Sequence, residues 1–240
     1  MSMDYDQLAE DYAQHRRTHP GVFMSLLSAA PRNGSGSVLE VGCGTGNYII
    51  ELQETLGCAC IGIDPAKEML AHASTRNSQV QYRTGRAERL DFPEAAFNLV
   101  FSVDVIHHVE DRGAYYREAF RVLKPGGQVC TVTDSEDIIR ARQPQSYYFP
   151  ECVEPEVKRY PRIEDLRQMM DAAGFQNIQE TRVEHRTAIF NIQAYKDKAF
   201  SSLYLIPQEA FEEGIQRMEA DLLLGPIPVI SRYLLLWGTR

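Results

Sequence analysis

The chain has 240 residues, 44% of them hydrophobic, and a formal net charge of −8. This length and composition are typical of a single globular domain with a well-buried core. An acidic chain repels a phosphate backbone, so we expect no nucleic-acid partner, and no apolar run approaches the roughly 18 residues that cross a membrane.

The cysteines also limit the class of protein. They are Cys43, Cys58, Cys60, Cys130 and Cys152. Their odd number and scattered positions predict reduced, buried side chains rather than a disulfide framework. Cys58 and Cys60 are too close for a typical zinc pair and the histidines lack metal-ligand spacing, so we expect no metal site. The first residues contain no apolar signal core, and we expect a cytoplasmic protein.

The first part of the chain predicts two helices, at residues 4–19 and 21–30, and then a regular alternation of strands and helices. We expect strands at residues 37–41, 59–63, 80–84, 98–103 and 128–133, with helices at residues 47–56, 66–76 and 114–123. The strands lack polar alternation, which indicates a parallel sheet covered by helices on both faces. Such alternation is typical of a doubly wound α/β fold.

The alternation ends near Ser135. Residues 140–160 are rich in Pro, Tyr and charge, and we expect an irregular, loosely held insertion over the strand ends. A helix follows at residues 163–173, then a strand within 178–190. Residues 192–224 are expected to be mostly helical, and a final strand at 229–237 is compatible with an antiparallel edge hairpin.

A glycine-rich motif joins the first strand to the next helix. It reads Val38-Leu39-Glu40-Val41-Gly42-Cys43-Gly44-Thr45-Gly46. Ligands of open α/β sheets bind at the carboxyl ends of strands, and glycines let the backbone turn sharply and approach a ligand. Glu40 disfavours a phosphate ligand and favours a cation, and the G-x-G-x-G spacing differs from the dinucleotide fingerprint. The alternative is a turn needed only for packing, and Glu40 favours a binding site.

Asp64 closes the second expected strand. A carboxylate there is placed to accept hydrogen bonds from both ribose hydroxyls of a nucleoside. The alternative is a helix N-cap, because Asp64 directly precedes Pro65 at an expected helix start. We favour the ribose contact.

Five stretches in this order resemble the class I S-adenosylmethionine (SAM)-dependent methyltransferases, in their small-molecule branch. They are LEVGCGTG at 39–46, GID at 62–64, GRAERLDFP at 85–93, FNLV at 97–100 and VLKPGG at 122–127. The resemblance implies a doubly wound, Rossmann-like α/β fold with a seven-stranded sheet whose last strand is antiparallel. It also implies a single domain over residues 1–240. That domain would have N-terminal lid helices at 1–30, a SAM-binding core at 37–134 and substrate-lid insertions at 135–160 and 190–226.

The same resemblance implies SAM as the cofactor, with S-adenosylhomocysteine as its product. The implied contacts are Tyr12, Arg16, Glu40, Gly42, Cys43, Gly44, Gly46, Asp64, Pro65, Met69, Ala87, Glu88 and Ser102. Ala87 would offer its backbone N–H, and Glu88 its side chain, to the adenine. Many relatives carry Asp where this chain has Arg86, which cannot accept a hydrogen bond. The adenine contact therefore shifts to Glu88 or to the backbone.

His107 and His108 follow the strand at 98–103 and are the candidate catalytic residues, together with Asp134 after the next strand. Histidine, with an ordinary pKa of about 6.5, is suited to act as a general base for a hydroxyl or protonated amine. Asp134 is placed to orient a histidine and stabilise its protonated form. The alternative is that one histidine is structural. Asp104 is a further candidate for contacting the substrate or the SAM amino group.

These features predict a methyltransferase that moves a methyl group from SAM to an oxygen or nitrogen atom of a small metabolite. One alternative is a C-methyltransferase of an aromatic or quinone-like acceptor, which needs no strong base. Another is a SAM-binding protein without catalysis. The expected partner is a small-molecule methyl acceptor, and the chain is expected to be a monomer or a homodimer.

Overall fold

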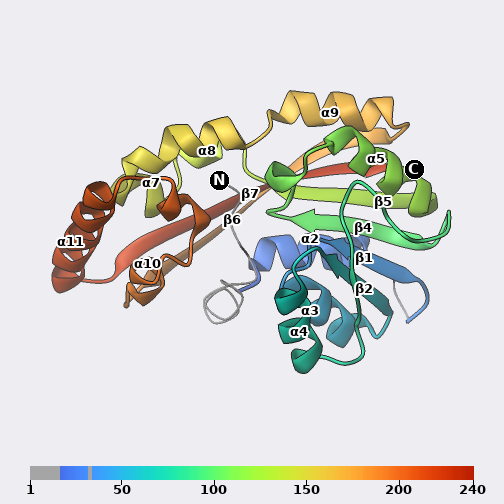
Figure 1. Cartoon of the computed structure of the whole chain (residues 1–240), viewed down its shortest axis with the longest axis horizontal. Helices are drawn as coiled ribbons and strands as arrows, with labels where there is room; N and C mark the ends of the chain where they lie inside the picture. The colour runs from blue at the N-terminus through green and yellow to red at the C-terminus, as the bar shows by residue number, and fades with distance from the viewer. Residues whose placement is uncertain (1–16, 32–33) are drawn as a thin grey trace.

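A seven-stranded sheet in the order β3-β2-β1-β4-β5-β7-β6 runs through the computed structural model, which describes residues 17–31 and 34–240 (Figure 1). Its strands are β1 (Ser37–Val41), β2 (Ala59–Asp64), β3 (Gln81–Thr84), β4 (Phe97–Val103), β5 (Leu123–Thr133), β6 (Gln176–Ile189) and β7 (Ile227–Thr239). Strands β1 to β5 pair in parallel, whereas β7 is antiparallel to both β5 and β6. The predicted α/β sheet with an antiparallel last strand is therefore confirmed.

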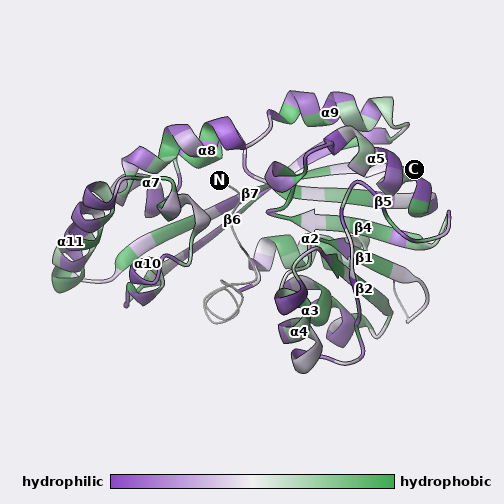
Figure 2. Cartoon of the chain, in the orientation of Figure 1, coloured by the Kyte–Doolittle hydropathy of each residue, from purple (hydrophilic) through white to green (hydrophobic). Residues whose placement is uncertain are grey.

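Helices cover both faces of the parallel strands. On one face lie α2 (Pro20–Ala29), α3 (Asn47–Leu56) and α4 (Lys67–Arg76), and on the other α5 (Arg112–Val122) and α9 (Ile163–Ala172). Successive residues of β1 alternate between these layers, since Val38 packs with the first set and Leu39 with the second. Figure 2 shows the central strands as largely hydrophobic, as burial on both faces requires.

The core elements match their predicted bounds closely. The helix predicted at 47–56 is α3, and the first predicted strand is β1. All five cysteines are free and buried, as expected. The predicted helix at 4–19 lies almost entirely outside the described residues.

The prediction of an irregular, loosely held segment at residues 140–160 is wrong. The segment contains α7 (Gln145–Tyr148), a 3-10 turn η2 (Pro150–Cys152) and α8 (Val153–Arg159), and it follows α6 (Glu136–Arg140). Helix α8 has acidic residues in its first turn and basic residues in its last turn, an arrangement that complements the helix dipole. Its proline falls in the first turn, where a missing N–H costs no helix hydrogen bond.

A separate hydrophobic core lies beyond the end of the parallel sheet, where the β6–β7 hairpin extends outward (Figure 1). We call this region the arm and define it as residues 145–159 and 190–227. It contains α7, α8, α10 (Gln193–Lys196), a 3-10 turn η3 (Ser201–Tyr204) and α11 (Gln208–Leu224). Its core includes Phe149, Tyr195, Leu203 and Met218. Segments far apart in the sequence thus share one small core, and their predicted role as substrate lids stays a prediction.

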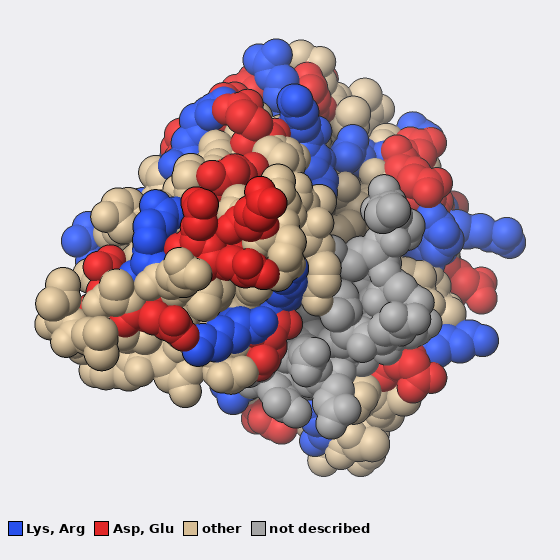
Figure 3. All heavy atoms as spheres, turned by 60° about the vertical axis from the view of Figure 1, so that its left-hand side comes forward, with Lys and Arg blue, Asp and Glu red and all other residues tan. Residues whose placement is uncertain are grey.

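Figure 3 turns the arm toward the viewer and shows acidic side chains gathered on this side of the molecule. Helix α11 alone carries Glu209, Glu212, Glu213, Glu219 and Asp221. Clustered negative charge of this kind repels anionic partners. Among the described residues, none of the helices combines the length and apolar character needed to cross a membrane.

The packing of α11 on α7 can be tested at Gly214. A Cβ atom placed there would lie 2.2 Å from Cε1 of Phe149, whereas one at Gly113 would meet only flexible or exposed atoms, the nearest 3.1 Å away on Arg117. We expect Gly214→Ala to lower the free energy of unfolding by about 1–3 kcal/mol through overpacking. Gly113→Ala should raise it by up to about 1 kcal/mol, since alanine is the better helix former. Urea unfolding of both variants is the measurement, and equal midpoints would contradict the close packing.

Candidate active site

The glycine-rich loop leaves β1 in a backbone conformation that side chains resist. Gly42, Gly44 and Gly46 have φ angles of 72°, 52° and 80°. At Gly42 the space is also closed, because a Cβ atom would lie 2.4 Å from Cγ2 of Val105. Glycine is therefore required at this position both by its φ angle and by the close approach of the segment after β4.

Hydrogen bonds from neighbouring strands hold the loop. The carbonyl oxygen of Ile63 accepts from the N–H groups of Gly42 (2.8 Å) and Cys43 (2.9 Å). The Asp64 carboxylate accepts from the N–H of Gly44 (2.8 Å) through Oδ2 and from that of Ala66 (2.9 Å) through Oδ1. The end of β2 thus sets the shape of the loop after β1.

The sequence left two interpretations of Asp64, a ribose contact and a helix N-cap. Helix α4 begins at Lys67 with Ala66 as its N-cap, so the helix-cap interpretation is wrong. Asp64 instead bonds the N–H groups of the glycine loop and of the turn that precedes the helix. A carboxylate oxygen can accept more than one hydrogen bond, so these two bonds are compatible with a contact to ribose hydroxyls. That contact stays a prediction.

Glu40 lies beneath the loop, only 3% exposed. Its Oε2 accepts a hydrogen bond from the N–H of Ile49 (3.0 Å), in the first turn of α3. Burial raises the pKa of this carboxyl well above its usual range, and the charge of Asp64 raises it further, while the bond from Ile49 opposes the shift. Sequence reasoning missed this structural role, in which a strand carboxyl satisfies a helix N-terminus.

The other predicted cofactor residues lie around this loop with different accessibility. Pro65 is exposed, Glu88 is half-buried, and Cys43, Met69 and Ala87 are buried. Cys43 points under the loop toward β2, since its Sγ would lie 2.7 Å from a Cβ at Gly62. Only its backbone can therefore face a ligand. Oε1 of Glu88 accepts from the N–H of Glu110 (3.1 Å) and Oε2 pairs with Arg86 (3.6 Å), so the adenine contact of Glu88 stays a prediction. Tyr12 and Arg16 lie outside the described residues.

Ser102 departs from its predicted role. Its side chain shares a face of β4 with Val100, is buried beneath α5, and accepts a hydrogen bond from the hydroxyl of Tyr115 (3.2 Å). We therefore withdraw the Ser102 hydroxyl from the candidate site. Two hydroxyls that sequence reasoning did not select, those of Thr45 and Tyr82, are buried near the glycine loop without a partner in the described structure.

The two histidines form the turn η1 (Ile106–His108) directly after β4. The ring of His107 stacks on Tyr160 at 4.1 Å and contacts the ring of His108 at 4.0 Å. Burial lowers the pKa of His107 well below its usual value, helped by the nearby His108 and Arg159. Burial and the charge of Arg159 lower the pKa of His108 to about 4. Both imidazoles are therefore neutral near pH 7.

Asp134 does not support His107 as predicted. Nδ1 of His107 is buried with no hydrogen-bond partner among the described residues, and the Asp134 carboxylate instead forms an ion pair with Arg142. Arg142 also pairs with Glu156 (3.1 Å), and Glu156 with Arg159 (2.5 Å). Burial raises the pKa of Asp134 to about 7 against the opposing effect of Arg142. These four residues form a charge network that joins the end of β5 to α8. No periodic pattern in the sequence predicted it.

Asp104 stands between β4 and the histidines in a strained conformation, with a φ angle of 57°. Its Oδ2 accepts a hydrogen bond from the hydroxyl of Tyr233 in β7 (2.9 Å). Residues held in this region of φ and ψ cluster at ligand sites and active sites. Asp104 therefore remains a candidate for contacting substrate or cofactor.

A family profile described as "Methyltransferase domain" matches residues 39–131, from β1 to β5. Residues 39–131 form a class I SAM-dependent methyltransferase domain. The predicted family and enzyme class are thereby confirmed, and the glycine loop, Asp64 and the histidines all lie at the carboxyl ends of the strands that this methyltransferase domain contains.

Relatives of this chain have names that refer to different substrates. Phosphoethanolamine N-methyltransferase of Triticum aestivum is 29% identical over 160 residues, which are 65% of this chain and 30% of the relative. Demethylmenaquinone methyltransferase of Bacillus licheniformis is 27% identical over 201 residues, which are 73% of this chain and 85% of the relative. This chain thus spans less than a third of the wheat protein that it matches.

A solved structure of Haemonchus contortus phosphoethanolamine N-methyltransferase 2, in complex with phosphomonomethylethanolamine and S-adenosylhomocysteine, has the same fold as this methyltransferase. Its TM-score is 0.62 at 19% identity, covering 98% of this chain and 57% of that one.

The buried carboxyl of Glu40 predicts a change of stability with pH. Its folded-state pKa lies above the unfolded value, so the folded chain keeps a proton that the unfolded chain has lost. The wild type should therefore lose stability relative to Glu40→Gln as the pH rises from 5 to 8. Urea unfolding at both pH values measures the difference. Glu209→Gln removes an exposed charge and is the control. A stability difference between the wild type and Glu40→Gln that does not change with pH would contradict the burial of Glu40.

Proposed function

We propose that this methyltransferase binds SAM at the glycine loop and transfers its methyl group to an oxygen or nitrogen atom of a small metabolite. The observation that carries the proposal is the pairing of β1 with β4. This pairing sets the loop after β1 beside the segment that bears two neutral histidines, with Val105 packed against Gly42. The glycine loop and a candidate base thus lie side by side at the carboxyl ends of β1 and β4.

The residues around the loop fit the chemistry of SAM. SAM supplies a methyl group on a positively charged sulfur, a good electrophile for in-line displacement. The Asp64 carboxylate is placed to accept hydrogen bonds from ribose hydroxyls, and Asp104 places a carboxyl group near a cationic ligand. The loop N–H of Gly44 is already bonded to Asp64, which disfavours an anionic pyrophosphate at that group.

His108 is the better candidate for the base that takes a proton from the acceptor. His108 is the more accessible of the two residues, although its ring is partly desolvated, whereas the ring of His107 is stacked on Tyr160. A neutral imidazole at the reacting atom can accept the proton of a hydroxyl or ammonium group as the methyl bond forms. In this proposal His107 and Tyr160 hold the ring of His108 in place by contact.

A second candidate is C-methylation of a quinone-like acceptor. It is supported by the similarity to demethylmenaquinone methyltransferase, which this chain covers over 85% of its length. Such a reaction places less demand on a base, because the acceptor carbon is activated by its own ring. The two candidates therefore differ in how strongly the rate depends on His108.

Asp64 tests the cofactor site. We expect Asp64→Ala to weaken SAM binding by about 1.5–3 kcal/mol, the value typical of hydrogen bonds to a charged group. Titration calorimetry with SAM and S-adenosylhomocysteine measures the change, with circular dichroism to establish that the variant is folded. Asp165→Ala removes a carboxylate from the exposed surface of α9 and should leave affinity unchanged. Wild-type affinity in Asp64→Ala would rule out the ribose contact.

His108 tests the reaction. For an oxygen or nitrogen acceptor, we expect His108→Asn to lower kcat by roughly 10²–10⁴-fold while leaving SAM affinity unchanged. Because the pKa of His108 is lowered to about 4, the wild-type rate should persist below neutral pH and fall only as the pH approaches that value. Phosphoethanolamine and a demethylmenaquinone analogue are the acceptors to compare, with His72→Asn as control. A full rate in His108→Asn would favour C-methylation.

A further inference from the structure

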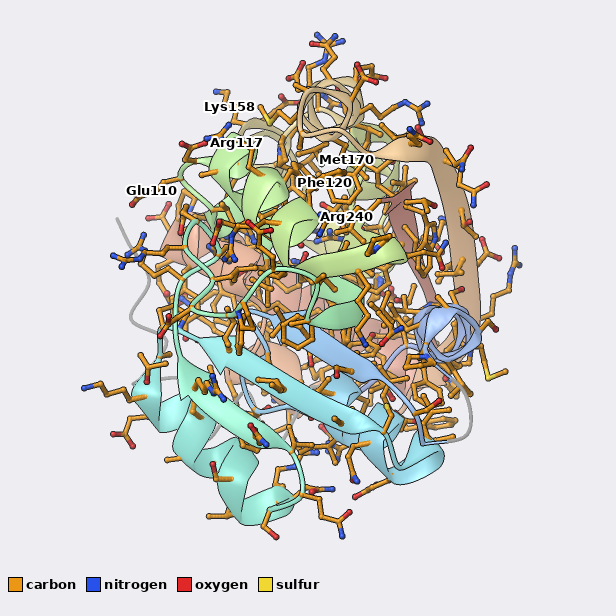
Figure 4. The ribbon with its side chains drawn as sticks, turned by 90° about the vertical axis from the view of Figure 1, so that its right-hand side faces the viewer. Glu110, Arg117, Phe120, Lys158, Met170 and Arg240 are labelled. Carbon is orange, nitrogen blue, oxygen red and sulfur yellow. The ribbon has the colours of Figure 1, made fainter. Side chains whose placement is uncertain are left out.

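The edge strand β6 is exposed along much of its length, and one of its faces packs against α2 at Val183. It stands last in the sheet and pairs with β7 alone among the described strands. Ten of its fourteen residues are exposed. Figure 4 shows it as the pale orange ribbon at the right margin, with side chains directed outward. An open edge of this length presents unpaired N–H and C=O groups that can pair with another strand.

The charges along this edge are self-complementary. Glu180, Arg182, Glu184 and Arg186 occupy alternate positions and therefore share one face of β6. If a second copy of β6 pairs antiparallel with Val183 opposite itself, Glu180 faces Arg186 and Arg182 faces Glu184. Each pairing occurs twice by symmetry. Opposite charges directly across antiparallel strands are stabilising, and like charges are destabilising.

Neighbouring registers on the same face lack this match. Centring the pairing on residue 182 sets Glu180 opposite Glu184, and centring it on residue 184 sets Arg182 opposite Arg186. The sequence therefore selects one register among those that keep the charged face together. The register shift between β6 and β7 ends at Gln179, so residues 179–187 form a regular stretch about Val183.

The charged side chains have internal partners that are compatible with this pairing. Glu180 lies 3.3 Å from Arg167, Arg182 lies 2.5 Å from Asp137, and Glu184 lies 2.7 Å from both Arg186 and Arg232. These pairs are exposed and contribute little by themselves. A guanidinium has five donors, so each arginine can hold a second carboxylate across the edge without losing the first.

We propose that β6 pairs antiparallel with β6 of a second copy of this chain, centred on Val183, and joins two seven-stranded sheets into one. The surface is continuous with the sheet and lies at its opposite end from β3. The pairing does not depend on the proposed reaction, and its test needs no substrate.

Charge exchange tests the pairing directly. Light scattering across a concentration series should give the wild type twice the chain mass of 27.3 kDa. Glu180→Arg sets like charges opposite Arg186 twice and should weaken the dimer by at least about tenfold. Adding Arg186→Glu to it restores opposite charges and should restore the dimer. A monomeric wild type, or a dimer that the single variant leaves unchanged, would overturn the proposal, and thermal unfolding of each variant establishes that it is folded.

A cysteine at the centre tests the register. In Val183→Cys the two thiols should face each other across the pair and form a disulfide under mild oxidation. Thr187→Cys is the matched control on the same strand face. Its symmetry mate would lie eight residues along the strand, about 27 Å away, and should not cross-link. The native cysteines are buried, so they add little background. Cross-linking of the Thr187 variant without that of the Val183 variant would overturn the register.

Discussion

The hydrogen bond from the N–H of Gly44 to the Asp64 carboxylate, 2.8 Å long, is the interaction on which the candidate site depends. In a phosphate-binding loop such N–H groups face the ligand. Here the chain supplies its own carboxylate from the next strand, and the buried carboxyl of Glu40 accepts a hydrogen bond from the first turn of α3. The loop is therefore already satisfied electrostatically. This explains in physical terms why a glycine-rich turn of this kind suits a cationic ligand.

Groups whose conformation or burial costs folding free energy gather toward the carboxyl ends of the parallel strands. Asp104 adopts a strained backbone conformation, and Glu40 has a raised pKa whereas the two histidines have lowered ones. The backbone strain of Asp104 and the burial of the Glu40 carboxyl cost folding free energy, and burial of the histidines costs it at a pH below about 6.5, where the unfolded chain is protonated. The cores on the two faces of the sheet contain mainly apolar residues and offset these costs. Concentration of strain and shifted ionisation at strand ends is the pattern expected of an active site.

Much of the fold could be predicted from the sequence, because apolar runs and glycines act locally. The bounds of β1 and α3 follow from such signals, as does the sharp turn at Gly42, whereas the bonds from the Asp64 carboxylate to the loop were not predicted. Strand parity could also have shown that Ser102 faces α5, since it shares a face with Val100. The stack of His107 on Tyr160 had no such signal, because the residues are distant in sequence and meet only through the fold.

The charge network of Asp134, Arg142, Glu156 and Arg159 was equally invisible in the sequence, and it has a practical consequence. It links Asp134, the residue after β5, to the arm through side chains that are mostly buried. A buried charge that loses its partner is strongly destabilising. A chimera that grafts the arm of one methyltransferase onto the sheet of another must therefore transfer these four positions together. If only α8 were exchanged, Asp134 and Arg142 would come from one parent protein and the residues at positions 156 and 159 from the other. The natural unit of recombination in this fold is the arm together with Asp134 and Arg142.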